Sequence, residues 1–244
     1  MKWGFFSVTH IASLIFAVLL IIGLHMILRK HSQKTQTIVL GILSFSGIVA
    51  VIWTLLRWGS PIEYLPLHLC ALNALVLPVA VFSRNKVLGN LLLVWALGAL
   101  AAVVVNNAQA EYELMSWTFI LYFFPHVLEF GIPVLLFSLG LVEKHPKYIL
   151  STLGITIGAF TIVHFANLAI NAYCLKHNLL DWAGEVIQVN YMYSLVPENP
   201  VFDLFWSILP VPYWYLYFII PILAVYLGIV YLPEFIKMRK APHG

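Results

Sequence analysis

The chain is dominated by apolar stretches that are long enough to cross a membrane. Hydrophobic residues make up 62% of its 244 residues and charged residues only 9%, whereas a soluble domain carries about 25% charged residues. A membrane-spanning helix needs about 20 consecutive apolar residues. Within lipid, the backbone must satisfy its own hydrogen bonds, and apolar stretches of this length do so as helices. The sequence therefore predicts an all-α membrane protein.

Seven such stretches predict a seven-transmembrane-helix bundle that forms a single domain over residues 1–244. The run from His10 to Leu28 is too long for a signal peptide and has no cleavage site after it, so we expect a retained first helix. A polar segment at 173–212 separates the last two spans, and we expect it to fold back as an outer cap loop or an interfacial segment. The predicted spans are 8–28, 36–56, 65–82, 87–105, 115–141, 149–172 and 213–236.

The lysines and arginines are distributed unequally between the two predicted sides of the membrane. Loops rich in these residues stay in the cytoplasm, which predicts an outer N-terminus, a cytoplasmic C-terminus and a multi-pass protein of the plasma membrane. The net charge of +3 is scattered among loops and does not indicate a nucleic-acid partner. Of the 13 basic residues, three lie on the outer side (Lys2, Arg57 and Lys176) and the rest on the other (Arg29, Lys30, Lys34, Arg84, Lys86, Lys144, Lys147, Lys237, Arg239 and Lys240).

Polar side chains form a stripe along the predicted helix 115–141. Thr118, Tyr122, His126 and Glu129 are spaced by four, four and three residues, which places them on one helical face. Ionisable groups inside a membrane are costly and by default indicate a functional site. Glu129 lies one turn from His126, where we expect it to orient the imidazole as the third member of a nucleophile–base–orienter set.

A second polar face lies on the predicted helix 65–82. Cys70 lies on it about 8 Å below the outer end of the helix, at a rise of 1.5 Å per residue. Asn73 shares the face of Cys70, whereas His68 lies on roughly the opposite side and is the poorer candidate base. His126 comes out at about 16 Å by the same rise, so a pairing with Cys70 requires a tilt or a kink. Pro125 and the later Pro133 make a kink plausible.

A third polar face consists of His164, Asn167 and Asn171, spaced by three and four residues on the predicted helix 149–172. We expect the three faces to converge on a polar chamber that opens outward beneath the segment 173–212. A cysteine with a histidine supplied from elsewhere in the chain is a candidate nucleophile and base. The chamber would place Cys70 and His126 in these roles.

Other interpretations of the same residues remain open. Polar residues on membrane helices often only hydrogen-bond to neighbouring helices, which is the favoured interpretation of Asn73, Asn90 and Asn167 taken singly. The two cysteines, Cys70 and Cys174, form a disulfide or stay free, and sequence does not decide. A zinc site is the rival chemistry, although no HExxH motif or equivalent spacing supports it; its candidate ligands are His68, His126, Glu129 and His164.

Four stretches of the sequence carry a family resemblance: Ile62–Cys70, Phe123–His126, Asn190–Tyr193 and Leu209–Tyr215. They resemble the YwaF-like family of bacterial integral membrane proteins, which is related to the eukaryotic transmembrane ether-phospholipid acyltransferases. The last stretch carries substitutions relative to the family's Gly-Pro-Trp-Pro-Trp-Tyr ending, which leaves the exit of the outer loop in question. The resemblance covers about residues 62–215. It is most specific in the combination of Ile62–Cys70 with Phe123–His126.

What this resemblance implies is a membrane-embedded phospholipid acyltransferase that works without a cofactor. The family's essential cysteine falls on Cys70 and its essential histidine on His126. Cys70 would carry a fatty acyl group as a thioester and pass it to a lysophospholipid hydroxyl, with His126 as general base. Phospholipid and lysophospholipid would then be the partners, held in the chamber by His68, Asn73, Tyr122, His164, Asn167, Asn171, Asn190 and Tyr191.

Two further classes of function use the same chamber. A small-molecule transporter or receptor is one, although secondary transporters usually show internal repeats and the sequence has none that we detect. A metal-dependent lipid hydrolase is the other, and tightly bound zinc in the purified protein would separate it from a thiol mechanism.

Overall fold

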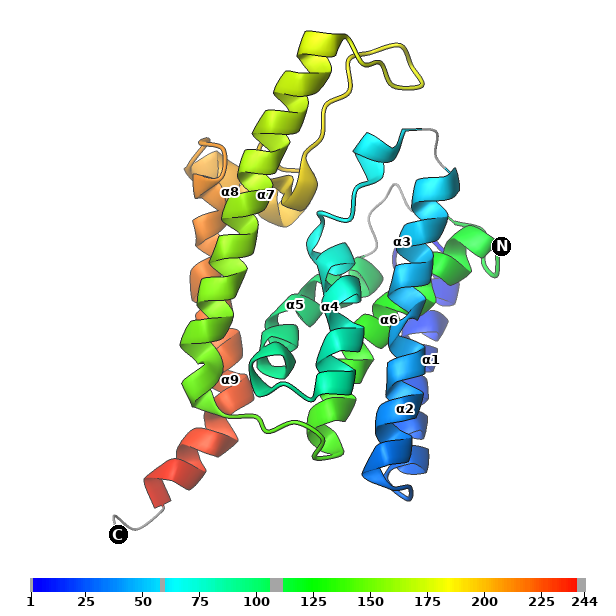
Figure 1. Ribbon diagram of the computed structural model, residues 1–244, viewed down its shortest axis with the longest axis vertical. Helices are drawn as coiled ribbons and strands as arrows, with labels where there is room; N and C mark the ends of the chain where they lie inside the picture. Colours follow the sequence, from blue (N-terminus) through cyan, green and yellow to red (C-terminus); the bar gives the residue numbers. More distant parts are fainter. Residues whose placement is uncertain (1, 58–59, 106–111, 241–244) are drawn as a thin grey trace. The chain divides into compact units, whose positions relative to one another are not determined.

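The computed structural model describes residues 2–57, 60–105 and 112–240, and it is helical in almost all of its regular structure (Figure 1). Within the described ranges, β-structure is limited to two isolated bridges, Lys2 with Glu113 and Leu180 with Val186. The longer helices are α1 (Val8–Leu28), α2 (Gln33–Ser44), α3 (Ser46–Arg57), α4 (Leu69–Ser83), α5 (Lys86–Val104), α6 (Trp117–Ser138), α7 (Ile149–His177), α8 (Pro200–Ile208) and α9 (Ile219–Lys240).

Six helices in the described part of the chain are long and apolar enough to cross a membrane, which confirms a multi-pass membrane protein. Each coincides with a predicted span, although the span at 36–56 is two helices, α2 and α3, that meet at Phe45. Their ranges are Val8–Leu28, Gln33–Arg57, Lys86–Val104, Trp117–Ser138, Pro146–His177 and Trp214–Arg239.

The remaining predicted span, 65–82, is shorter than the sequence indicated. Helix α4 begins only at Leu69 and has 15 residues, or roughly 22 Å at the usual helical rise. Leu65 is extended, with φ −56° and ψ 143°, because a residue that precedes proline is disfavoured in the helical region. Helix α4 therefore begins four residues later than predicted, and the preceding segment contains a short 3₁₀ helix, η1 (Pro61–Tyr64).

The chain divides into two compact units by its internal contacts, and each is described by itself. Unit 1 comprises residues 1–53 and 69–144, and unit 2 comprises residues 54–68 and 145–244. The expectation of a single domain over residues 1–244 stays a prediction.

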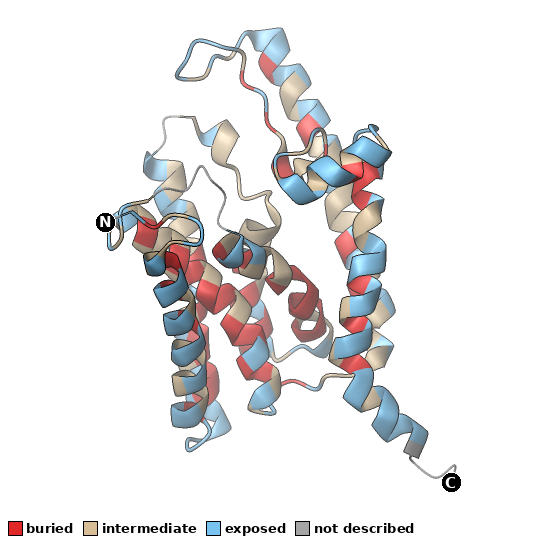
Figure 2. Ribbon diagram, turned by 180° about the vertical axis from the view of Figure 1, so that it is seen from behind, coloured by how far each residue is buried: buried red, intermediate tan, exposed pale blue. Residues whose placement is uncertain are grey.

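Unit 1 is built around α5 and α6, which pack against each other and against α4. Buried residues concentrate on these helices in Figure 2, whereas α1 carries large exposed apolar side chains along its outer face. Burial of apolar surface inside the unit and exposure of apolar surface outside it are both expected of a helix bundle in lipid. The core of unit 1 includes Leu77, Leu92, Ile132, Leu135 and Leu136.

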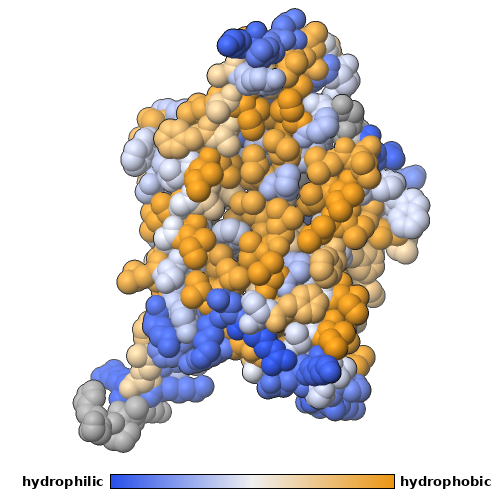
Figure 3. All heavy atoms as spheres, in the orientation of Figure 1, coloured by the Kyte–Doolittle hydropathy of each residue, from blue (hydrophilic) through white to orange (hydrophobic). Residues whose placement is uncertain are grey.

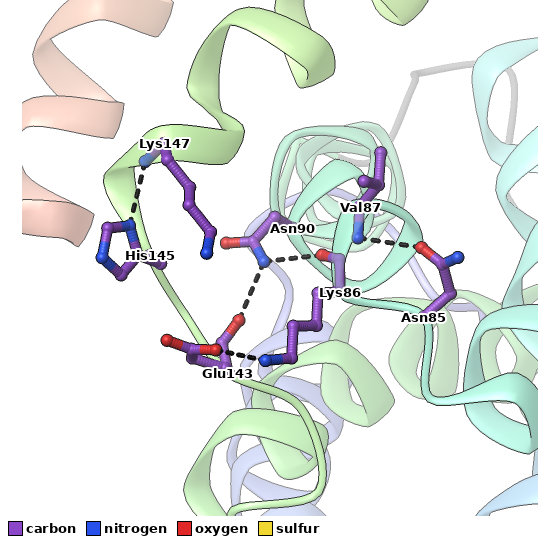
Figure 4. Close-up of polar contacts among 7 residues, drawn as sticks. All are labelled: Asn85, Lys86, Val87, Asn90, Glu143, His145 and Lys147. Carbon is purple, nitrogen blue, oxygen red and sulfur yellow. Dashed lines mark hydrogen bonds and ion pairs between the residues drawn. The ribbon is translucent and has the colours of Figure 1, made fainter.

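Hydrophilic side chains gather at the ends of helices, and hydrophobic ones cover their middle on the face shown in Figure 3. In unit 1, one end is closed by polar contacts: Lys86 pairs with Glu143 at 2.5 Å, and the Asn90 amide donates to the Glu143 carbonyl at 3.0 Å (Figure 4). Arg84 donates to Gln33 and Thr37 and so ties the end of α4 to the start of α2. The basic residues of unit 1 that were predicted to face the cytoplasm lie at this end.

Unit 2 consists of the segment around η1, the long helices α7 and α9, and the chain that links them. The linker contains two elements that the sequence analysis left as loop, namely η3 (Tyr191–Tyr193) and α8, and another 3₁₀ helix, η4 (Trp214–Phe218), precedes α9. Helix α7 continues to His177, five residues beyond the predicted end. A small apolar cluster of Phe205, Tyr215 and Leu216 joins α8 to η4.

Candidate functional site

Cys70 is the second residue of α4, which begins three residues after Pro66. Its thiol is free, and the residue is partly buried. Cys174 is also a free thiol, fully buried on α7. The disulfide that the sequence left open is therefore absent between these two described cysteines.

His126 lies on α6 with its ring held by the helix's own backbone. Its Nδ1 is 2.6 Å from the carbonyl oxygen of Tyr122, one turn earlier. A carbonyl can only accept a hydrogen bond, so Nδ1 carries the hydrogen and Nε2 keeps its lone pair in the neutral imidazole. The Tyr122 ring lies 4.5 Å from the His126 ring between centroids, and its hydroxyl donates to the Ala102 carbonyl at 3.0 Å. His126 is thus presented in the tautomer that accepts a proton at Nε2.

Glu129 and Asn73 form a buried polar pair between α6 and α4. Glu129 is 4% exposed and Asn73 is fully buried, and the Asn73 amide donates to the Glu129 backbone carbonyl at 3.3 Å. A Cβ added to Gly47 would lie 2.7 Å from Glu129 Oε1, so the carboxyl group packs against α3. Its Oε2 and the Asn73 Oδ1 have no hydrogen-bond partner among the residues that the structure describes. The observed restraint on the His126 ring is the Tyr122 carbonyl.

Unit 1 thus brings together five of the predicted site residues on two helices that pack against each other, α4 and α6. The described hydrogen bonds include none between Cys70 and His126. The arrangement supplies a thiol, a base-competent imidazole and a buried carboxyl group, which are the components of nucleophilic catalysis. The five residues are Cys70, Asn73, Tyr122, His126 and Glu129.

The polar face of α7 binds the returning linker in unit 2. Asn167 donates to the Tyr191 carbonyl at 2.8 Å and accepts from the Tyr191 N–H at 3.0 Å. Asn171 makes the same pair of bonds with Val189, at 3.0 and 2.7 Å. His164 Nδ1 lies 3.1 Å from the Ser194 hydroxyl. The three residues share one face, as predicted. In unit 2 the two asparagines satisfy backbone groups of the returning linker, whereas His164 contacts the Ser194 side chain.

Three of the four stretches that carried the family resemblance meet at this loop. The Tyr191 hydroxyl donates to the Ile62 carbonyl and accepts from the Leu65 N–H at 3.2 Å. The Tyr215 hydroxyl donates to the Tyr193 carbonyl, and the Tyr213 N–H donates to the Ser194 carbonyl at 2.7 Å. Sequence reasoning placed these stretches apart along the chain and had no signal for their convergence.

His68 also belongs to unit 2, where its ring is held in the opposite manner to that of His126. Its Nδ1 accepts the Met192 N–H at 3.3 Å, so the neutral ring carries its hydrogen on Nε2. Burial lowers the pKa of His68 to about 4, because desolvation disfavours the charged imidazolium. Burial likewise raises the pKa of Tyr191 to about 12. Both groups are therefore neutral at physiological pH.

A cleft in unit 2 contains residues that the sequence analysis did not select. Its volume is about 170 Å³, and its lining combines His68, Asn190 and Tyr191, which were predicted to bind substrate, with residues that were missed. Glu63 and Tyr64 belong to the first resemblance stretch, so a signal existed for them. The missed lining residues are Glu63, Tyr64, Gln188, Val189 and Glu198.

The rival zinc ligands are divided between the two units, with His126 and Glu129 in unit 1 and His68 and His164 in unit 2. Among residues 2–57, 60–105 and 112–240, no group of three or more His, Cys, Asp or Glu side chains is placed to hold a metal ion.

The sequence matches a family of transmembrane proteins. The family model of the TMEM164 family matches residues 5–231, so the chain belongs to this family of transmembrane proteins. Searches among curated proteins and among solved structures returned no significant match.

Proposed function

We propose that this member of the TMEM164 family is a membrane-embedded phospholipid acyltransferase of the YwaF-like type, with Cys70 as the acyl carrier. The observation that supports this most is the His126 ring, whose Nδ1 bond to the Tyr122 carbonyl leaves Nε2 as a base. It lies on the helix that packs against the helix of Cys70. A thiol in a membrane span needs such a base, because a thiol is a poor nucleophile until it becomes a thiolate.

The first half-reaction transfers an acyl chain from an ester donor to the protein. His126 Nε2 takes the Cys70 proton, the sulfur attacks the donor's carbonyl carbon, and a carbon–sulfur bond replaces the carbon–oxygen ester bond. The departing alkoxide of the donor lipid receives the proton from the His126 imidazolium and leaves as an alcohol. The product is an acyl-Cys70 thioester and a deacylated donor.

The second half-reaction reverses these roles. His126 takes the proton of a lysophospholipid hydroxyl, whose oxygen attacks the thioester carbonyl and releases the Cys70 thiolate, which recovers the proton. The complete cycle replaces one oxygen ester by another and is therefore nearly thermoneutral, so it requires no ATP. We assign Glu129 and Asn73 to support of the α4–α6 contact that carries both reacting groups.

The proposal includes a seven-span topology in the plasma membrane with the N-terminus outside. In this arrangement α4 is a short additional span, the third in chain order, and the segment 65–68 before it leads from the outer surface to Cys70. The basic end of unit 1 then faces the cytoplasm.

The test is acyl transfer by the purified protein in phospholipid nanodiscs, with a labelled lysophospholipid as acceptor. Cys70→Ala and Cys70→Ser should lose nearly all transfer while keeping the wild-type unfolding temperature, because an alcohol is a far weaker nucleophile at its free pKa. Cys174→Ala is the matched control and should retain transfer. Undiminished transfer by Cys70→Ala would refute Cys70 as the acyl carrier. Absence of transfer by the wild-type protein would refute the acyltransferase proposal and leave a transporter or receptor function as the better explanation.

A further inference from the structure

The cleft of unit 2 has two walls that come from distant parts of the sequence. One wall is the segment around η1, with Glu63 and Tyr64, and the other is the linker with Gln188, Asn190 and Glu198. His68 and Tyr191 line it as well.

Tyr191 holds the two walls together. Its side chain is 1% exposed, and its hydroxyl bonds both the carbonyl of Ile62 and the N–H of Leu65 on the opposite wall. Its own backbone is fixed by Asn167 of α7. The separation of the walls is therefore set by buried hydrogen bonds, and the cleft is a preformed feature of the unit.

Asn190 fixes the carboxylate of Glu198. Its side-chain amide donates to Glu198 Oε1 at 2.7 Å and to the Val196 carbonyl at 2.8 Å, and its Oδ1 accepts from the Leu195 N–H at 3.0 Å. These bonds occupy one oxygen of the carboxylate and leave Oε2 for another partner. Glu63 supplies a second carboxylate from the other wall, and no lysine or arginine is among the residues that line the cleft.

The rest of the lining is aromatic or uncharged. His68 packs its ring against Tyr191 at 5.3 Å between centroids. Its hydrogen bond within the described part of the chain is the one that Nδ1 accepts from the Met192 N–H. Tyr64 adds a further ring. Carboxylates combined with aromatic faces form the environment that proteins use to bind organic ammonium groups.

We propose that this cleft binds an organic ammonium group, with Glu63 and Glu198 supplying the negative charge and Tyr64 and His68 supplying the aromatic wall. The same chemistry is offered by two sources, the ammonium of a zwitterionic phospholipid head group and a free soluble amine. The binding step is independent of acyl transfer, so it can be tested without reference to Cys70.

The experiment has two arms that separate these sources. In the first, the purified full-length protein in detergent is titrated with choline, and binding is followed by saturation-transfer NMR of the choline methyl groups at constant ionic strength. In the second, the protein in nanodiscs is exchanged between phosphatidylcholine and phosphatidylglycerol, and retained lipids are counted by native mass spectrometry. Magnesium chloride serves as a competitor in both arms.

We expect phosphatidylcholine to be retained in preference to phosphatidylglycerol, and choline to bind more weakly at the same site. Glu63→Gln and Glu198→Gln should each weaken binding by about fivefold, the upper range for one partly exposed charge. Asp203→Asn is the matched control: it removes the same charge from α8 of unit 2, outside the cleft, and should leave binding unchanged. Choline binding without lipid preference would assign the cleft to soluble amines.

Three results would overturn the proposal. One is equal retention of the two lipids together with no choline signal, and another is equal binding by Glu63→Gln, Glu198→Gln and the wild type. Displacement by magnesium at concentrations far below those of choline would assign the cleft to a divalent cation instead. Because all variants are assessed for binding and thermal stability alone, loss of acyl transfer in any of them has no bearing on the outcome.

Discussion

His126 and His68 are both largely removed from water, yet the backbone has given them opposite chemistry. The His126 ring donates from Nδ1 to a carbonyl of its own helix, which leaves a lone pair on Nε2. The His68 ring accepts at Nδ1 from an N–H that lies 124 residues away in the sequence, which leaves a hydrogen on Nε2. The His126 ring is therefore a base at Nε2, and the His68 ring is a hydrogen-bond donor at the same atom. A neighbouring backbone group decides the role, and residue type alone does not.

The largest effect should be the difference between two single variants, in which His126 or His68 is replaced by alanine. General-base catalysis is worth about 10²–10⁴-fold, so His126→Ala should lose acyl transfer by that order while still binding lipid. His68→Ala should lose less than about tenfold, because the neutral ring of His68 has no lone pair available on Nε2. Transfer rates at matched protein concentration measure the difference. An inactive His68→Ala beside an active His126→Ala would show that the base has been assigned to the wrong ring.

A smaller effect should follow from loosening the loop that holds His68. Asn167→Ala removes the partner of both backbone groups of Tyr191, and unsatisfied buried groups cost about 1–3 kcal/mol each. We therefore expect a lower unfolding temperature. In hydrogen exchange, the amides of unit 2 should lose protection first, while those in the helices of unit 1 stay protected. Asn85→Ala, which alters an exposed N-cap of α5, is the control. Equal loss of protection in both units would contradict a local role.

The smallest of the three expected effects is on the pH dependence of stability, which should also distinguish the two regions. The pKa of His68 is about 4 in the folded chain and about 6.5 in an unfolded one, so the unfolded state binds the extra proton between these values. Stability is full above pH 6.5 and falls as the pH drops toward 4. His68→Asn keeps an acceptor for the Met192 N–H and removes the titration. Unfolding temperatures at pH 7 and pH 5 should differ less for this variant than for the wild type.

Much of the membrane architecture could be predicted because it depends on local sequence. Apolar length alone located α1, α5 and α6 to within a few residues, since a span is defined by its own composition. The start of α4 was also encoded locally, in Pro66, but the apolar run obscured it. Helix α8 was missed because it lies in a stretch whose polar and proline residues favour a loop.

The candidate site was predictable only in part, for a physical reason. Helical spacing correctly grouped His164, Asn167 and Asn171 on one face, because residues on a helix have fixed relative positions. Their partners in the returning linker follow from the path of a long loop, which spacing does not determine. The cleft shows the same limit, since Glu63 and Glu198 line it together although they lie 135 positions apart in the sequence.

The central claim is that Cys70 carries an acyl group, and the mass of the intact protein tests it most directly. Protein incubated with phospholipid and without acceptor, then quenched in acid, should gain the mass of one fatty acyl chain, and peptide mapping should place it on Cys70. Hydroxylamine should remove it, as expected of a thioester, and His126→Ala should accumulate it slowly. An unmodified Cys70 in protein that still transfers acyl chains, or an adduct that maps to Cys174, would contradict the account.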